Sequence, residues 1–130
     1  METQDSPAVK ITLAHIDAWG HHDWDTTRAL LAPEVHALVT STQPNLGGGE
    51  FTGVDNYMIR KIKGSQLVKP GSVRIISTIG DARNALILMT MRIGLGLNGT
   101  MVSMARSSLV MLDEHQNIKE ERDQFFLLSE

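Results

Sequence analysis

Two charged residues in the apolar second half of the chain, Arg92 and Asp123, are the first candidates for chemistry. Arg92 is the only charged residue in the stretch 84–97. A charge among apolar neighbours needs a partner or contact with water, because burying an unpaired charge is very costly. Desolvation raises the pKa of a carboxylate and a nearby guanidinium lowers it, so Asp123 beside Arg92 could act as a general acid or base near neutral pH. The alternative is a structural ion pair that supports a sheet.

The distance of Arg92 from the next turn predicts which residue lies opposite it. Asn98-Gly99 is the strongest short signal for a β-hairpin with a two-residue turn. Such a turn sets residue 97 opposite residue 100, and counting back along both strands sets Arg92 opposite Ala105. Residues that are directly opposed share one face of a sheet, so Arg92 and Ala105 are expected to point the same way.

A second turn, at 113–117, predicts the position of Asp123. It sets Leu112 opposite Ile118, and therefore Ser107 opposite Asp123. Alternate residues of one strand also share a face, so Arg92, Ser107 and Asp123 are expected to form the polar floor of one pocket. This register requires regular turns, because one β-bulge would move the side chains beyond it to the other face of the sheet.

The elements that must position these residues are helical first and extended later. Ser6 and Pro7 are typical of a helix start, and apolar residues then cover most of the helical wheel over 8–20. Asp23 can cap a short second helix that runs through residue 31. The remaining expectations are a strand over 35–42, a loop over 43–49, a helix over 54–63, and strands over about 72–79, 84–97, 100–112 and 118–128.

Short turns between the last four strands require an antiparallel meander. Helices followed by a meander indicate an α+β domain with helices on one face of a curved sheet. A chain of 130 residues is long enough for one domain with a real core. We therefore expect a single domain over 1–130, with residues 1–6 disordered.

The sheet face opposite Arg92 is also apolar, which predicts that something covers it. An antiparallel sheet with one wet face carries polar residues on that face. Because the sequence offers no further layer, we expect a second copy of the chain to pack there and form a homodimer. Residues assigned to this face are Ile87, Met89, Met91, Ile93, Leu95, Val102, Met104, Val110 and Leu112, with Arg106, Glu120 and Arg122 also on the outer side.

Composition excludes several classes of function. A net charge of −3 and the lack of a basic run give no footprint for nucleic acid, and the absence of cysteine removes disulfides and thiol catalysis. His21 and His22 lack two further ligands at suitable spacing, so no metal is expected. Gly47-Gly-Gly49 lacks the Lys-Ser/Thr of a phosphate loop, and no cofactor is expected. No signal peptide or membrane-length apolar run is visible, which favours a cytoplasmic protein with no membrane partner.

Four sequence features follow one another along the chain: Ala14-His-Ile-Asp-Ala-Trp19, Asp23-Trp24-Asp25, Gly53-Val54 and Asp113-Glu-His-Gln-Asn-Ile-Lys-Glu-Glu-Arg-Asp123. Their order and spacing resemble the nuclear transport factor 2-like (NTF2-like) superfamily, and within it the SnoaL-like domains. The resemblance covers essentially the whole chain. It implies a cone-shaped fold, in which the N-terminal helices pack in the concave face of a curved, mainly antiparallel sheet and a pocket opens between them.

The last strand, Ile118-Lys-Glu-Glu-Arg-Asp-Gln-Phe125, resembles that of limonene epoxide hydrolases. In those enzymes this strand supplies one of two pocket aspartates, and the match falls on Asp123. Their bridging arginine falls on Arg92, but the second aspartate, two residues later, falls on Gly94. We therefore expect epoxide hydrolysis to be weak or absent, unless another carboxylate such as Glu121 replaces the missing group. SnoaL-type cyclases also use a pocket aspartate on the last strands as an acid or base for an enolising substrate, and Asp123 fits that role.

Further residues are expected to line the pocket beside Arg92 and Asp123. A lone histidine on an apolar helix face, such as His15, is more often a hydrogen-bonded core residue than a second acid–base group. Trp19 and Tyr57 either line the pocket or fill the core. The expected substrate-binding residues are His15, Trp19, Tyr57, Thr90, Ser107, Glu121 and Phe125.

Two functions of different classes fit these observations. The first is a cofactor-independent cyclase, isomerase or hydrolase that acts on a small apolar molecule. Asp123 would be its acid or base, and Arg92 would stabilise an oxyanion or orient Asp123. The second is a non-catalytic ligand-binding or dimerisation module of the same fold. The charged pair favours the enzyme, whereas the missing second aspartate favours the binding module over a hydrolase.

Overall fold

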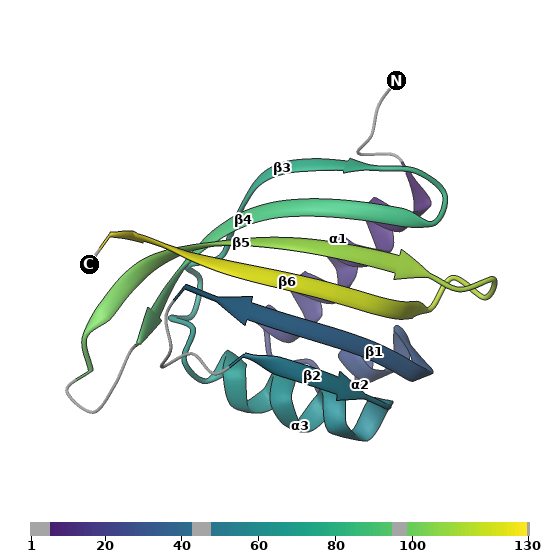
Figure 1. Cartoon of the computed structure of the whole chain (residues 1–130), viewed down its shortest axis with the longest axis horizontal. Coiled ribbons are helices and arrows are strands. Elements are labelled where there is room, and N and C mark those ends of the chain that lie inside the picture. The colour runs from purple at the N-terminus through teal and green to yellow at the C-terminus, as the bar shows by residue number, and fades with distance from the viewer. Residues whose placement is uncertain (1–5, 43–47, 95–98, 130) are drawn as a thin grey trace.

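The computed structural model describes residues 6–42, 48–94 and 99–129, which form three helices and one six-stranded sheet (Figure 1). The helices are α1 (Pro7–Gly20), α2 (Trp24–Ala29) and α3 (Val54–Ser65). The strands are β1 (Leu31–Ser41), β2 (Gly49–Thr52), β3 (Arg74–Gly80), β4 (Asn84–Gly94), β5 (Met101–Leu112) and β6 (Ile118–Ser129).

The first helix begins as the sequence predicts. Pro7 occupies its first turn, and the Ser6 hydroxyl oxygen accepts a hydrogen bond from the Val9 amide at 3.1 Å. Ser6, the last residue of the segment expected to be disordered, therefore caps α1, and residues 1–5 lie outside the described residues. Within the described part of the chain, no helix has the length and apolar character needed to cross a membrane.

The sheet has the strand order β2-β1-β6-β5-β4-β3. Strands β3 to β6 form the predicted antiparallel meander, and β1 pairs with β6 in parallel. The short edge strand β2 was not predicted; it pairs with β1 and leads directly into α3. The α+β class with a mainly antiparallel sheet is confirmed.

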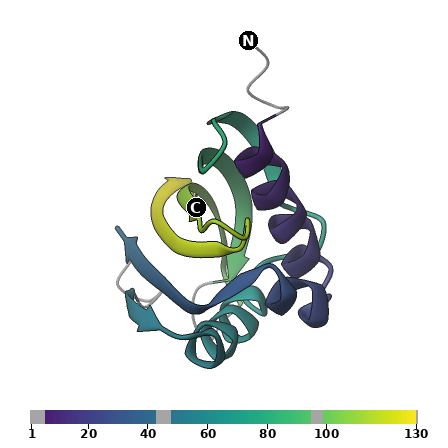
Figure 2. The same cartoon turned by 90° about the vertical axis from the view of Figure 1, so that its right-hand side faces the viewer.

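The three helices lie on one side of this curved sheet. In Figure 1, α1 passes behind the strands and α3 runs below β2. Figure 2 shows the strong curvature of β5 and β6, with α1 on the concave side. This is the cone-shaped arrangement that the family resemblance implies.

The Met-rich face of β4 and β5 packs inside the molecule, not against another chain. Met89 and Met104 are fully buried, and they belong to one core cluster with Ala8 and Trp19 of α1. The prediction that this face is the outer one is therefore wrong. The prediction that its residues point to the other face of the sheet from Arg92 is right for those that the structure describes, and Leu95 lies outside the described residues. Both faces of β4 are apolar, so the alternation along the strand marks two faces without showing which one the helices cover.

One β-bulge changes the register of the last hairpin. Leu112 lies opposite Ile118 as predicted, but Met111 lies opposite Glu120, which leaves Lys119 as an extra residue on β6. Asp123 is therefore opposite Ser108 rather than Ser107. The extra residue turns Asp123 to the inner face of the sheet.

The β4–β5 hairpin differs from its prediction by two residues. Arg92 lies opposite Ser103, and Ala105 lies opposite Thr90. The predicted turn position Asn98 lies outside the described residues, and the ladder ends with Gly94 opposite Met101. A shift of two residues keeps every side chain on the face that the predicted register gives it. That face was expected to line the pocket but is the outer one, so Arg92 points away from the helices.

Alanine substitutions at two neighbouring residues of β4 test which face is the core. Met89→Ala should lower the free energy of unfolding by about 2–5 kcal/mol, because it leaves a cavity in the interior. Leu88→Ala is the matched control, since Leu88 is 37% exposed on the outer face, and it should cost less than about 1.5 kcal/mol. Urea denaturation measures both changes, and equal costs would contradict the assignment of the faces.

Candidate active site

A cavity of about 340 Å³ opens between α3 and the inner face of the sheet. Its walls are mostly apolar and aromatic, and its inner end carries charged side chains. Residues on its wall are Trp19, Val39, Phe51, Tyr57, Arg60, Lys61, Lys63, Gly64, Ser65, Leu67, Val68, Met91, Ile93, Arg106, Glu121, Asp123 and Phe125. An apolar cavity with a few convergent polar groups is the usual form of a small-molecule site.

The guanidinium of Arg106 lies at the centre of the charged group. Its Nη2 atom is 3.1 Å from Glu121 Oε2 and 3.0 Å from Asp123 Oδ1. All three side chains are at most 5% exposed. Arg106 therefore bridges two carboxylates inside the protein.

Ser108 fixes the position of Asp123 from the neighbouring strand. The Arg106 Nε atom donates to the Ser108 hydroxyl at 2.8 Å, and that hydroxyl donates to Asp123 Oδ1 at 2.6 Å. One oxygen of Asp123 thus accepts from both Arg106 and Ser108. We infer that the orientation of this carboxyl group is fixed before any substrate arrives.

Glu121 is held by groups from α3 on its other side. The Tyr57 hydroxyl donates to Glu121 Oε1 at 2.6 Å, and Lys61 Nζ lies 3.3 Å from Glu121 Oε2. Because the Tyr57 hydroxyl donates its hydrogen bond to Glu121, its oxygen can accept a hydrogen bond from His15 Nε2, which lies 3.5 Å away. A chain of polar contacts therefore runs from α1 through α3 to β6.

The two carboxyl groups have opposite proton affinities. Burial raises the pKa of Asp123 to about 7, against the effect of Arg106 and with a further contribution from Glu121. Burial alone would also raise the pKa of Glu121, but Lys61, a hydrogen bond with Asp123 and Arg106 hold it well below its usual range. Near neutral pH, Glu121 is ionised and Asp123 exchanges a proton.

The remaining titratable groups keep fixed charges around this pair. Burial lowers the pKa of His15 to about 3, so its imidazole is neutral at physiological pH. Burial raises the pKa of Tyr57, and the Glu121 carboxylate adds to this effect. Burial would lower the pKa of Arg106, but Asp123 and Glu121 outweigh it and the pKa rises. Burial lowers the pKa of Lys61, whereas the Glu121 carboxylate raises it. Asp123 is the group in this cluster whose pKa is brought to about 7.

The structure brings together only part of the site predicted from the sequence. Asp123, Glu121, Tyr57, Trp19 and Phe125 line the cavity. His15 is buried behind Tyr57 as a hydrogen-bonded core residue, which was the commoner of its two expected roles.

Arg92, Thr90 and Ser107 do not belong to the cavity. The Arg92 guanidinium donates to Ser103 Oγ at 2.7 Å on the outer face, and Thr90 and Ser107 lie on that same face. The prediction that Arg92 and Asp123 face each other is wrong. Its cause is the bulge at Lys119, which turned Asp123 inward while Arg92 remained outside.

Arg106 was missed because it was assigned to the outer side, and Ser108 was not among the predicted site residues. Arg106 occupies an alternate position between the buried residues Met104 and Val110 on β5. The sequence signal was a charged residue on the same strand face as buried apolar residues. It indicates a buried charge that needs a partner, but only when that face of β5 is known to be the inner one. Lys61 gave no such signal, because a lysine on a helix of mixed polarity is ordinary.

Among the described residues, no group of three His, Asp or Glu side chains is placed to hold a metal ion. The cluster offers one exchangeable proton on Asp123, one permanent carboxylate and a guanidinium that binds both.

No family model and no curated protein matches the chain. Solved structures do match over nearly its whole length. An NTF2-like protein from Burkholderia xenovorans LB400 aligns with a TM-score of 0.75 and 15% identity, covering 96% of this chain and 92% of that one. This chain has the NTF2-like fold.

Two other solved structures that match this chain come from Mycobacterium tuberculosis. An LEH-like epoxide hydrolase aligns with a TM-score of 0.69 and 20% identity, covering 92% of this chain and 82% of that chain. Rv0760c, solved in complex with estradiol-17β-hemisuccinate, aligns with a TM-score of 0.74 and 14% identity, covering 92% of this chain and 93% of that chain. At these identities the likeness describes the fold.

The raised pKa of Asp123 predicts a pH-dependent difference between the wild-type protein and Asp123→Asn. The folded protein holds a proton on Asp123 up to about pH 7, whereas the ordinary pKa is 3.8. The contribution of Asp123 to stability is therefore complete below pH 4 and is lost as the pH rises to about 7. Between pH 5 and 7 the wild type should lose stability relative to Asp123→Asn, by at most about 1.4 kcal/mol per pH unit.

Urea denaturation across this pH range measures the difference. Asp81→Asn serves as the control, because backbone hydrogen bonds from Arg83 and Asn84 lower the pKa of Asp81 and its carboxylate stays ionised over the whole window. A constant difference between the wild type and Asp123→Asn would show that Asp123 carries no extra proton in the folded protein.

Proposed function

We propose that this protein is a cofactor-independent enzyme that transfers a proton to or from a small, largely apolar molecule, with Asp123 as the acid–base group. The observation that supports this most is a buried carboxyl group with a pKa of about 7 on the wall of a 340 Å³ cavity. A catalytic acid or base works best when its pKa lies near the working pH. Cyclisation, isomerisation and addition of water are the reactions that such a group can serve.

The neighbours of Asp123 suit this role because they hold one another in place around it. Glu121 is ionised and keeps Arg106, Lys61 and the Tyr57 hydroxyl in place. Arg106 in turn stabilises the ionised form of Asp123 after it has given up its proton. Because these contacts exist before a substrate binds, little reorganisation accompanies proton transfer.

Two neighbours with this fold support a small-molecule site. One is an LEH-like epoxide hydrolase, and the other was solved with estradiol-17β-hemisuccinate. We propose that the cavity here also accepts a small organic molecule. A non-catalytic ligand-binding module of the same fold is the alternative.

Hydrolysis of epoxides is the least favoured of the candidate reactions. The arginine that bridges two carboxylates is Arg106, so the residue two positions later is Ser108 rather than Gly94. A serine cannot supply the second acid or base. Glu121 is the nearby second carboxylate, but its oxygens already accept from Tyr57, Lys61 and Arg106. We therefore expect turnover of limonene epoxide to stay weak or absent.

A generic proton-abstraction probe tests Asp123 without knowledge of the natural substrate. In 5-nitrobenzisoxazole a base removes the ring C–H proton, the N–O bond breaks, and a coloured cyanophenolate forms. The wild-type rate should rise with pH through about 7, because only ionised Asp123 accepts a proton. Asp123→Asn should lower the rate by about a hundredfold or more and leave the affinity for the probe within about tenfold.

Ser107→Ala is the matched control, since Ser107 lies on the outer face of the same strand as Ser108. It should leave both the rate and the pH profile unchanged. Full activity in Asp123→Asn would remove the enzyme proposal and leave only the binding module.

We also propose a homodimer through the outer face of the sheet. Leu86, Leu88, Phe126 and Leu128 expose apolar side chains there, with exposures of 37% to 57%. Exposed apolar patches of this kind are typical of interfaces between copies of a chain. These residues replace the Met-rich set predicted from the sequence, which is buried within one chain.

Sedimentation at micromolar concentration tests the dimer and its location. The wild type should sediment as a dimer, and Leu88→Lys should weaken the association by at least tenfold, because it places a charge in the interface. Lys10→Gln on an exposed position of α1 is the control and should not change the association. A monomeric wild type would contradict the proposal.

A further inference from the structure

The cavity wall carries more cations than carboxylates. Four basic side chains line it, and the acidic side chains on it are Glu121 and Asp123; the basic ones are Arg60, Lys61, Lys63 and Arg106. The whole chain has a net charge of −3. The cavity is thus positive in a protein that is negative overall, and this local excess needs an explanation.

The inner two cations are already neutralised. Arg106 binds both Glu121 and Asp123, and Lys61 lies 3.3 Å from Glu121. When Asp123 is ionised, these two cations and two carboxylates balance one another. When Asp123 is protonated, the inner group carries one positive charge, but Arg106 and Lys61 still contact carboxyl groups. Among the described residues of the cavity wall, the cations without a carboxylate partner are therefore Arg60 and Lys63.

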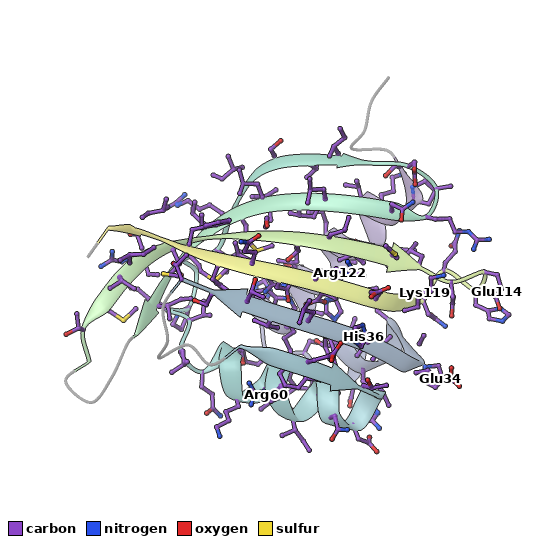
Figure 3. All side chains as sticks on the ribbon, viewed as in Figure 1. Glu34, His36, Arg60, Glu114, Lys119 and Arg122 are labelled. Carbon is purple, nitrogen blue, oxygen red and sulfur yellow. The ribbon has the colours of Figure 1, made fainter. Side chains whose placement is uncertain are left out.

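Arg60 and Lys63 lie at the cavity mouth on α3. Both are exposed, and in the described part of the chain no carboxylate lies within ion-pair distance of either one. They are three residues apart on one helix, so their side chains are neighbours. The Arg60 guanidinium lies 4.4 Å from the centroid of the Phe51 ring, which also lines the cavity (Figure 3 labels Arg60 on α3, next to β2). A cation packed on a wall residue is held close to the opening.

The polarity of the cavity then changes in order from the mouth to the inner end. The mouth cations Arg60 and Lys63 are exposed, the carboxylates of Glu121 and Asp123 are buried, and apolar side chains such as Val68, Ile93 and Phe125 line the same cavity. An anionic group at the inner end would meet the carboxylates of Glu121 and Asp123, whereas at the mouth it meets two unpaired cations. Trp19 lines the same cavity, and its indole N–H has no acceptor among the described residues.

We infer that the substrate is an amphiphilic anion, an apolar molecule with one carboxylate or similar acidic group, whose charge binds between Arg60 and Lys63. Its apolar body fills the cavity, and its far end reaches Asp123. The placement of the reacting end rests on the proposed function; the preference for an anion rests only on the charges of the cavity.

A matched pair of fluorescent probes tests the preference. 1-Anilinonaphthalene-8-sulfonate and N-phenyl-1-naphthylamine share one aromatic skeleton, and only the first carries a negative charge. In a Trp24→Phe background, Trp19 is the sole tryptophan of the chain, so energy transfer from Trp19 measures binding of the probe, and the mouth and control variants described next show whether it binds at the cavity.

The anionic probe should bind about tenfold tighter than the neutral one, since its ion pairs with Arg60 and Lys63 are exposed and each adds only a modest binding free energy. Added salt should reduce the difference. Arg60→Gln with Lys63→Gln should bring the two affinities within about twofold. The control double variant, Lys10→Gln with Lys119→Gln, removes the same charge from exposed positions off the cavity wall and should keep the preference.

Equal affinities in the wild type, or an unchanged preference after both mouth cations are removed, would overturn the inference. Asp123→Asn separates this result from the proposed function. If it keeps both the anion preference and the full rate with 5-nitrobenzisoxazole, the acid–base proposal fails and the anion site stands. If the wild type shows no preference while Asp123→Asn loses its rate, the anion site fails and the acid–base proposal stands.

Discussion

The contact of one buried guanidinium with two carboxylates is the interaction on which the site depends. Arg106 Nη2 lies within 3.1 Å of an oxygen from each of Glu121 and Asp123. Breaking a buried ion pair by removing one partner costs about 3–5 kcal/mol, because an uncompensated charge remains. Without Arg106, two carboxylates would stand side by side in an apolar interior. The cation therefore allows both acids to occupy the same cavity.

That pairing in turn depends on a single extra residue in β6. Because Lys119 is bulged, Glu121 and Asp123 point inward and line the cavity. Their neighbours Glu120 and Arg122 lie on the outer face, where both take part in ion pairs. Figure 3 shows Arg122 beside His36 on the face turned away from α1. A regular strand would have exchanged these two sets of charges.

The arrangement separates two tasks that one carboxylate could not perform together. Glu121 accepts from Tyr57, Lys61 and Arg106, and these donors keep it ionised. Asp123 accepts from Arg106 and Ser108 through one oxygen, and burial keeps its pKa near neutrality. Two similar side chains thus differ in proton affinity because their surroundings differ, a principle common to enzymes with paired carboxyl groups. One acid holds the framework and the other is available for exchange.

The sequence by itself determined the α+β class, the meander and most of the element boundaries. Local signals were sufficient for these features, such as the Ser6-Pro7 start of α1 and the turn that sets Leu112 opposite Ile118. It also pointed to Asp123 and to most of the aromatic cavity wall. These predictions depend on residue types and on short-range spacing, which the sequence contains directly.

Only the tertiary structure decided which face of the sheet is inside and which arginine meets Asp123. Both faces of β4 are apolar, so alternation could not choose between Met89 and Leu88 as the core residue until the helices packed on one side. The bulge at Lys119 has no distinctive residue type, yet it inverts the side chains from Glu120 to Leu127, up to a second register shift at the end of β6. Arg92 and Arg106 both interrupt apolar runs. Helix packing makes the face of Arg106 the inner one. Arg106 is therefore the arginine that meets Asp123, because the buried carboxylates on that face offset the cost of burying its charge.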